Sequence, residues 1–315
     1  MNPMAEYKHL YGPVPSRRLG RSLGIDMAPM KTCCFDCIYC QLGPTTVHTA
    51  ERGDYVDVDE VLDELERWLS SGREADWLTF SASGEPTLNI DLAEAIVRAR
   101  QLSEMPVALL TNGALLWKKG VRDAAMQADL IMPSLDAATE ETFQGINRPV
   151  SEITLERYIQ GLRETVAAFH GEVWLEVMLV AGVNDSEEEL DALQRAIDRI
   201  APDEVQLNTV VRPALSGEAE RVDNHTLIHA RVILGPRAMV IPSAWEGEMA
   251  EMAEHDEAEV LALVNYRPCT LEDVAHGISM HPNEALKYLQ HLVSEEKIRM
   301  EERDGETFYL RAEAE

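Results

Sequence analysis

This chain of 315 residues has few cysteines, few basic residues and no long apolar run. The uncharged stretch over residues 105–117 is shorter than the roughly 20 apolar residues that span a membrane, and Asn112 and Gly113 interrupt it. We interpret it as a buried strand with its exit loop, and we expect no membrane partner. No targeting segment is evident, so the expected location is the cytoplasm, where thiols stay reduced.

Basic residues are half as many as acidic ones: 28 lysines and arginines stand against 56 aspartates and glutamates, for a net charge of −28. Such a chain repels polyanions at long range, whereas nucleic-acid-binding proteins normally present a basic face. Nucleic acid is therefore not the expected partner. A local basic group, Arg17, Arg18, Arg21 and Lys31, lies near the cysteines. It indicates either contact with an anionic substrate or redox partner, or a set of solvated and ion-paired side chains.

Four of the five cysteines lie within residues 33–40. Cys33, Cys37 and Cys40 follow a C-x3-C-x2-C pattern. A zinc site needs four ligands, usually in two pairs, but there is no second pair here and His48 stands alone. Disulfides among cysteines this close together would not join distant segments. Three thiolates at this spacing can hold three irons of a cubic 4Fe–4S cluster and leave the fourth iron without a protein ligand.

Cys34 leaves two alternatives open. As a fourth ligand it would close the cluster into an electron carrier, although its adjacency to Cys33 makes simultaneous ligation of a cube strained. Otherwise it is a small residue of the loop. We favour the second interpretation and assign the metal to Cys33, Cys37 and Cys40.

Two motifs together resemble the radical S-adenosylmethionine (radical SAM) superfamily. The cysteine pattern follows a candidate strand at 22–27, and aromatic Tyr39 precedes the third cysteine. A second candidate strand, 77–83, leads into Gly84-Glu85-Pro86-Thr87, which is similar to the Gly-Gly-Glu motif of that superfamily, with Ser83 in place of the first glycine. The resemblance implies that Gly84 and Glu85 receive the amino group of S-adenosylmethionine. It also implies a 4Fe–4S cluster, S-adenosylmethionine as cofactor and an electron donor such as flavodoxin or ferredoxin.

Within the superfamily the chain looks closest to the tRNA-wyosine synthase-like group. The motifs that carry this likeness lie at residues 12–20, 111–113, 134–137 and 146–149. Members that make wyosine carry further cysteines for a second cluster, whereas here Cys269 is alone far downstream. One alternative function is therefore modification of tRNA, which the group implies and the net charge disfavours. Another is a non-enzymatic iron–sulfur redox sensor, which would have no need of an S-adenosylmethionine site.

Apolar runs alternate with amphipathic stripes between residues 22 and 210, which predicts an α/β fold. Strands are expected at 22–27, 77–83, 106–111, 130–135, 173–181 and 204–210, and apolar helix faces at 58–69, 155–169 and 190–200. This alternation predicts a parallel sheet with right-handed crossovers, either doubly wound or closed toward a barrel. The resemblance favours a partial (β/α)6 barrel, with 238–242 as a possible added strand.

Polar residues close several of these strands, and the reactive groups of such barrels gather at the carboxyl ends of the strands. We assign Asp136 to the ribose hydroxyls of S-adenosylmethionine, with Asn112 and Ser134 in support. Glu176 either faces inward as a ligand group or is paired to a buried base. No residue is singled out as catalytic, and nothing in the sequence identifies the substrate.

The chain is expected to divide into a barrel domain over 1–245, an acidic linker over 246–254 and a small domain over 255–315. Three short helices and a hairpin in the small domain resemble a winged helix-turn-helix. The six basic and fourteen acidic residues of the small domain give it a net charge of −8. Among lysines and arginines, the third helix contains only Lys287. We therefore expect the small domain to contact protein, as a lid or partner surface, and not to grip DNA.

Overall fold

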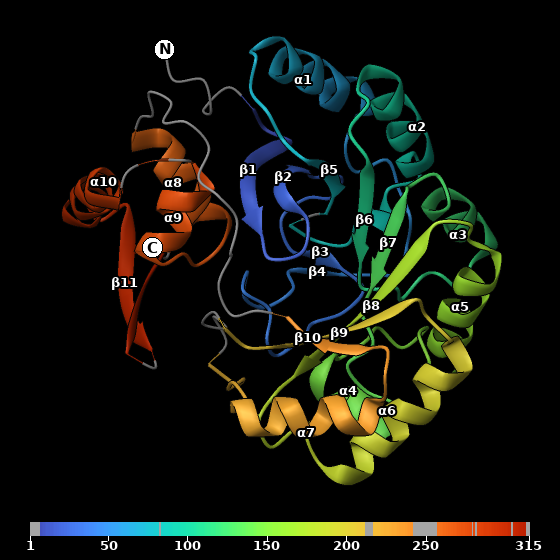
Figure 1. Cartoon of the computed structure of the whole chain (residues 1–315). Helices are drawn as coiled ribbons and strands as arrows, with labels where there is room; N and C mark the ends of the chain where they lie inside the picture. Colours follow the sequence, from blue (N-terminus) through green and yellow to red (C-terminus); the bar gives the residue numbers. More distant parts are fainter. Residues whose placement is uncertain are drawn as a thin grey trace.

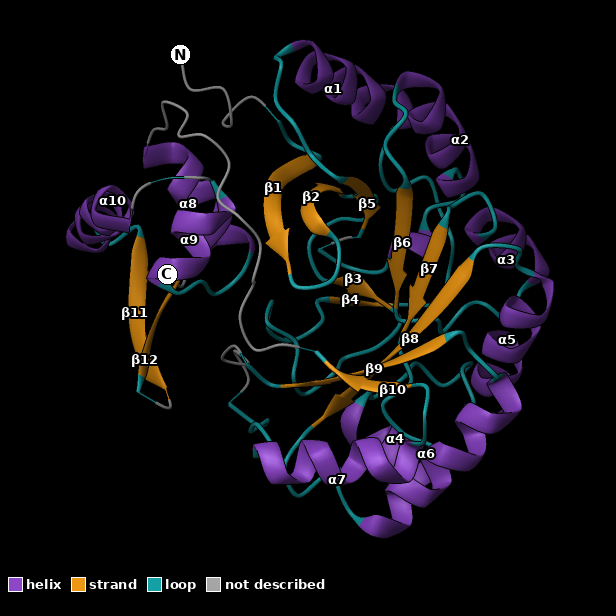
Figure 2. Ribbon diagram, in the orientation of Figure 1, coloured by secondary structure: helices purple, strands orange, loops and turns teal. Residues whose placement is uncertain are grey.

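The computed structural model describes residues 7–81, 83–211, 217–241, 257–278, 280, 282–303 and 305–312. The expected linker at 246–254 lies outside these ranges. One sheet of eight strands dominates the fold and curves around an interior (Figures 1 and 2). Its order is β1 (Leu10–Ser16), β2 (Gly20–Ile25), β5 (Trp77–Phe80), β6 (Val107–Thr111), β7 (Leu130–Pro133), β8 (Glu172–Leu179), β9 (Glu204–Thr209) and β10 (Ala238–Val240).

The sheet from β2 to β10 is parallel, which confirms the α/β class. The barrel is not closed, because β1 and β10 form the two edges of an open sheet. Strand β10 lies within the range expected for an added strand. The short strands β3 (Thr32–Cys33) and β4 (Val47–His48) pair with each other beside the main sheet.

Strand β1 was not predicted from the sequence. It pairs antiparallel with β2, and its register shifts between Tyr11 and Val14. The sequence does not predict this strand because it contains Pro13 and Pro15, and prolines normally argue against a strand. An edge strand with an irregular register tolerates them, because there a missing N–H removes few ladder hydrogen bonds.

Helices cover the outside of the curved sheet (Figure 1). They are α1 (Val58–Ser70), α2 (Leu92–Leu102), α3 (Lys119–Ala125), α4 (Glu140–Ile146), α5 (Leu155–Ala168), α6 (Glu187–Ile200) and α7 (Asn224–Leu234), with a 3₁₀ turn η1 (Pro86–Leu88). The predicted stripes are the buried faces; in α1, for example, Val61, Leu65 and Trp68 are at most 1% exposed. Within the described ranges, every helix is too short or too polar to traverse a bilayer.

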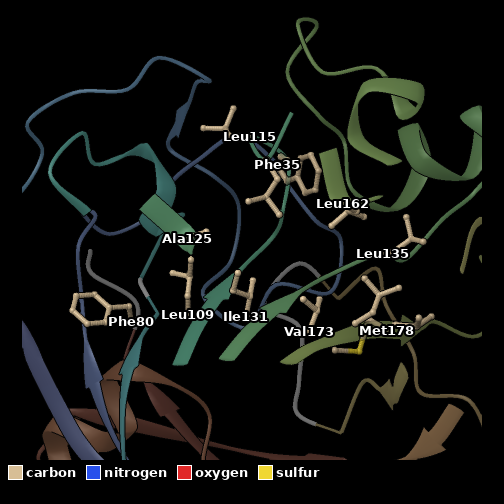
Figure 3. Close-up of a cluster of buried hydrophobic side chains, with 14 of the residues drawn as sticks. Phe35, Phe80, Leu109, Leu115, Ala125, Ile131, Leu135, Leu162, Val173 and Met178 are labelled. Atoms are coloured by element: carbon tan, nitrogen blue, oxygen red, sulfur yellow. The ribbon is translucent and has the colours of Figure 1, made fainter. Parts of the chain in front are cut away.

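The main core lies between the sheet and these helices. Phe80, Leu109, Ile131 and Val173 are register partners on four successive strands and form a buried row across the sheet (Figure 3). Burying each such side chain contributes about 1.5–3 kcal/mol to folding. This row fixes the relative height of the strand ends, and therefore of the polar residues that follow them.

The C-terminal unit, residues 257–312, contains α8 (Glu257–Tyr266), α9 (Leu271–Gly277), α10 (Pro282–Ser294) and the hairpin β11 (Ile298–Arg303) and β12 (Glu306–Arg311). These are the three helices and two strands expected from the sequence. Its likeness to a winged helix-turn-helix and the domain boundaries stay predictions. Its apolar core also includes Val14 of β1, so the unit packs directly on the edge of the main sheet.

Candidate functional site

The cysteine loop, residues 26–57, connects β2 to α1 and lies against the segment 146–150 that follows α4. The Asp36 N–H donates to the Asn147 carbonyl at 2.9 Å, and the Val150 N–H donates to the Cys34 carbonyl at 3.1 Å. These bonds hold the loop in an extended pairing with the 146–149 motif. The motif therefore has a structural role here, since it fixes the backbone that carries the cysteines.

Gly84, after β5, touches the same loop from the other side. A Cβ at Gly84 would lie 2.1 Å from the Thr32 carbonyl oxygen, and the Glu85 N–H donates to that oxygen at 3.0 Å. The Lys31 N–H donates in turn to the Ser83 carbonyl at 2.7 Å. The sequence analysis assigned this glycine to close approach of a ligand; in the structure its close neighbour is the cysteine loop itself.

Each of the three assigned cysteines has a nitrogen donor at its sulfur. The pairs are Asn112 Nδ2 to Cys33 Sγ at 3.4 Å, Asn147 Nδ2 to Cys37 Sγ at 3.5 Å, and Lys31 Nζ to Cys40 Sγ at 3.0 Å. Lys31 reaches Cys40 from a left-handed backbone conformation, with φ of 59°. Sulfur binds metal as a thiolate, and hydrogen-bond donors of this kind would support each sulfur as a metal ligand.

The arrangement of the sulfurs suits a cluster better than one ion. Around a single zinc, with Zn–S bonds of about 2.3 Å, tetrahedral sulfurs would lie about 3.8 Å apart. Among the described residues, the sulfurs of Cys33, Cys37 and Cys40 do not all come within 4.8 Å of one another. A group larger than one ion can span that wider spacing, and the three cysteines are free thiols. This donor set therefore fits a 4Fe–4S cluster.

Cys34 differs from its neighbours. Its side chain is 0% exposed, packs in the main core and contacts the Asn112 side chain. Burial raises the pKa of Cys34 well above the usual value, whereas the hydrogen bond with the Cys34 thiol lowers the pKa of Cys33. Burial also raises the pKa of Cys37, so metal binding there would release a proton. Cys34 therefore has the environment of a neutral core thiol.

Asp136 is enclosed by donors from its own chain. It accepts hydrogen bonds from Tyr39 Oη at 2.5 Å, Asn147 Nδ2 at 2.8 Å and the Met178 N–H at 2.9 Å, and it is 0% exposed. Burial raises the pKa of Asp136 to about 6. Its immediate effect is to fix Tyr39 and Asn147 beside Cys37.

Glu85 is also buried among internal donors. Its oxygens accept from Thr87 N at 3.0 Å, Thr111 Oγ1 at 2.5 Å and Asn112 N at 2.8 Å. Burial raises the pKa of Glu85 while these hydrogen bonds oppose the rise. The carboxylate thereby ties the end of β5 to the end of β6 and sets the position of Asn112 over Cys33.

Ser134, directly after β7, forms an isolated parallel backbone bridge with Glu176 of β8, and Tyr158 Oη donates to the Ser134 carbonyl. The Glu176 carboxylate pairs with Arg18, and both side chains are mostly buried. Of the two alternatives for Glu176, pairing with a base is the one present in the structure, although its side chain also lines a cavity.

That cavity, of about 400 Å³, lies at the interior face of the sheet beside the cysteine loop. Its lining draws on the loop, the sheet, β1 and the C-terminal unit: Tyr11, Arg17, Arg18, Cys37, Tyr39, Cys40, Thr79, Glu176, Met178, Asn208, Tyr266 and Arg267 are among the lining residues. Arg21, by contrast, is paired with Asp76 at 3.1 Å and with Glu74. The basic group predicted from the sequence is thus divided between the cavity, the cysteine loop and a surface ion pair.

Sequence reasoning missed two kinds of residue at this site. Asn147 contacts both Cys37 and Asp136, and the one signal for it was its place in the 146–149 motif. Tyr266 and Arg267 come from the C-terminal unit and had no signal, because their contact with the cavity depends on tertiary packing.

A family model for the Radical SAM superfamily matches residues 27–193. The chain is 30% identical over 307 residues to a UPF0026 protein of Methanocaldococcus jannaschii, covering 96% of this chain and 95% of that relative.

Two further similarities bear on length and fold. The chain is 36% identical over 305 residues to a GTPase Obg of Brachyspira hyodysenteriae, covering 96% of this chain but 45% of the relative, so it spans less than half the length of that protein. A structure of TYW1 with a lysine–pyruvate adduct bound shares 16% identity and a TM-score of 0.53, over 71% of this chain and 75% of that one. At this identity the likeness to TYW1 is one of fold.

Proposed function

The chain belongs to the Radical SAM superfamily and to the UPF0026 family, and from that membership we propose that it is an enzyme with a 4Fe–4S cluster on Cys33, Cys37 and Cys40. One observation carries the proposal: each of the three sulfurs has its own nitrogen donor, and two of them line a cavity of about 400 Å³. A purely structural metal site would be closed by protein ligands and would need no cavity at its edge.

When bound, such a cluster supplies the electron that cleaves S-adenosylmethionine into methionine and a 5′-deoxyadenosyl radical, which removes hydrogen from a substrate. The contribution of the chain is to orient the partners and exclude water. Lys31, Asn112 and Asn147 would donate hydrogen bonds to the three sulfurs that hold the cluster. Asn112 follows β6, Lys31 lies in the cysteine loop and Asn147 follows α4, so the buried row of the sheet fixes the first of these donors directly.

We propose that S-adenosylmethionine binds at the carboxyl ends of the strands. The proposed set is Tyr39, Gly84, Glu85, Asn112, Ser134, Asp136 and Glu176. One unsatisfied atom supports this location: Asn147 Oδ1 is buried next to Cys37 and Asp136, and within the part of the chain that the structure describes nothing forms a hydrogen bond with it. A hydroxyl of the bound ribose would satisfy it, which removes a cost of about 1–3 kcal/mol.

Glu85 and Asp136 have a distinct part in this proposal. Their carboxylates already accept several internal hydrogen bonds, so they act chiefly by fixing Asn112, Tyr39 and Asn147. The electron enters from a partner protein such as a flavodoxin or ferredoxin. The net charge of −28 argues against tRNA as the substrate, and a cavity beside the sulfurs argues against a redox sensor.

The ligand assignment is tested by counting iron and sulfide after anaerobic reconstitution. Wild type should hold about four irons and four sulfides per chain, and C33A, C37A and C40A should each lose most of them. C34A is the matched control, since it removes a neighbouring thiol that lies in the core and not at the cavity. Equal iron loss in C34A and C37A would contradict the three-ligand assignment.

A further inference from the structure

The C-terminal unit contributes two side chains, Tyr266 and Arg267, to the wall of the cavity that holds Cys37 and Cys40. We propose that Arg267 binds an anionic group of the substrate, a carboxylate or a phosphate, in this cavity. This inference rests on the proposed function, because it takes the cavity to be where the substrate meets the cluster. It names the chemical class of the substrate, which the family does not.

The state of the Arg267 side chain is the first argument. Its Nε and Nη2 atoms are buried, and no described residue forms a hydrogen bond with them. A guanidinium keeps its charge at all accessible pH values and offers five N–H donors in a planar fork. Leaving such donors buried and unpaired is costly, and a carboxylate or phosphate oxygen satisfies them in the bidentate geometry they favour.

The charges around the cavity are the second argument. Among the described lining residues, three are arginines, Arg17, Arg18 and Arg267, and one, Glu176, carries a carboxylate. The charge of Arg18 is offset by its ion pair with Glu176, and Arg17 donates to Asn208 Oδ1 at 3.2 Å. The cavity is lined by more arginines than carboxylates, although the whole chain has a net charge of −28. The positive electrostatic field of these arginines favours the entry of an anion.

The third argument is that Arg267 is held in position from both sides. The ring of Tyr266 stacks on that of Tyr11, with centroids 3.7 Å apart and an interplanar angle of 21°. Tyr11 in turn bonds Ser81 at the end of β5 and lies over Gly24, where a Cβ would come within 1.9 Å of its ring. After Arg267, Cys269 exchanges two backbone hydrogen bonds with β12, at 3.0 and 2.8 Å. The guanidinium is thus presented to the cavity by a fixed backbone.

The test is calorimetric titration of anaerobically reconstituted full-length protein with inorganic phosphate, pyrophosphate and malonate, at constant ionic strength. Wild type should bind one anion per chain, and R267Q should bind it about 10- to 100-fold more weakly, since one charge-assisted contact is removed. R267K keeps the positive charge but loses the bidentate guanidinium geometry, so its affinity for the anion should lie between those of wild type and R267Q. R237Q removes an exposed arginine outside the lining and is the charge-matched control. The phosphate and malonate arms tell which kind of anion the site prefers.

Three results would overturn the proposal. One is that wild type binds none of the three probes, and another is that R267Q binds them as tightly as wild type. The third is that saturating S-adenosylmethionine abolishes anion binding, which would assign Arg267 to the carboxylate of that cofactor. The iron content and the thermal unfolding midpoint of every variant show whether it is folded and carries its cluster. If wild type binds the anion through Arg267 but forms no 5′-deoxyadenosine, the proposed function fails and the anion site stands.

Discussion

Substituting alanine at Gly84 should damage the cysteine loop more than its size suggests. The added Cβ would lie 2.1 Å from the Thr32 carbonyl oxygen and 2.9 Å from its carbon, and both are backbone atoms that cannot rotate away. The loop must therefore move away from the end of β5. Two backbone hydrogen bonds depend on this contact, Glu85 N to Thr32 O at 3.0 Å and Lys31 N to Ser83 O at 2.7 Å.

The size of the effect follows from these contacts. Overpacking costs about 1–3 kcal/mol, and the loss of two hydrogen bonds adds about 1–3 kcal/mol, so G84A should lose about 2–6 kcal/mol of unfolding free energy. Gly145 in α4 provides the matched control, because a Cβ there meets no atom within 4 Å. Replacing a helical glycine with alanine in open space should stabilise the protein by about 0.5–1 kcal/mol.

The assay is the urea midpoint of cluster-free protein, followed by iron uptake of the same preparations. G84A should unfold at lower urea than wild type and take up little iron, whereas G145A should match or exceed wild type in both. If G84A unfolds at the wild-type midpoint and loads the same amount of iron, the close packing of the loop against β5 is not what positions the cysteines.

Two other changes test the contacts around the site. Burial raises the pKa of Asp136 from 3.8 to about 6, so the folded protein keeps a proton that the unfolded chain releases, and stability falls as pH rises through this window. The difference in unfolding free energy between wild type and D136N should therefore fall by about 3 kcal/mol as the pH rises from 4 to 6, and it should stay constant above pH 6. Urea midpoints of both proteins measured across this pH range test the expectation, and a difference that does not change with pH would contradict it. Removing the Tyr266 ring, which stacks on Tyr11, should cost about 1–3 kcal/mol in Y266A but little in Y266F, and equal thermal midpoints for both variants would show that the stack does not hold the C-terminal unit.

Most of the parallel sheet could be predicted from the sequence, because β5, β6 and β7 are short, largely apolar runs buried on both faces, and in β8 apolar residues alternate with less buried ones. Strand β1 could not, since Pro13 and Pro15 are acceptable only at an irregular edge, and neither the edge nor the irregularity is visible in the sequence. The three cysteines and Gly84-Glu85 could be proposed from the sequence because their signals are local.

The surroundings of the sulfurs could not be predicted in the same way. Asn112 and Asn147 lie 79 and 110 residues from the cysteines that they contact, and only the folded chain brings them together. Polar residues at strand ends predicted Glu85 and Asp136 as site residues, which stays a prediction. Pattern alone could not tell that their oxygens are engaged by their own chain, because that depends on which donors packing places around them. Arg267 reaches the cavity through the packing of a separate unit on β1.

The central claim, that this chain cleaves S-adenosylmethionine at a cluster held by Cys33, Cys37 and Cys40, is tested most directly by product analysis. Anaerobically reconstituted protein is reduced with dithionite, given S-adenosylmethionine and sampled over time by chromatography with mass detection. Wild type should yield 5′-deoxyadenosine and methionine in equal amounts, and a variant with all three cysteines replaced by alanine should yield neither above background. Wild-type protein that carries its full iron, is reduced and still yields no more 5′-deoxyadenosine than that variant would contradict it.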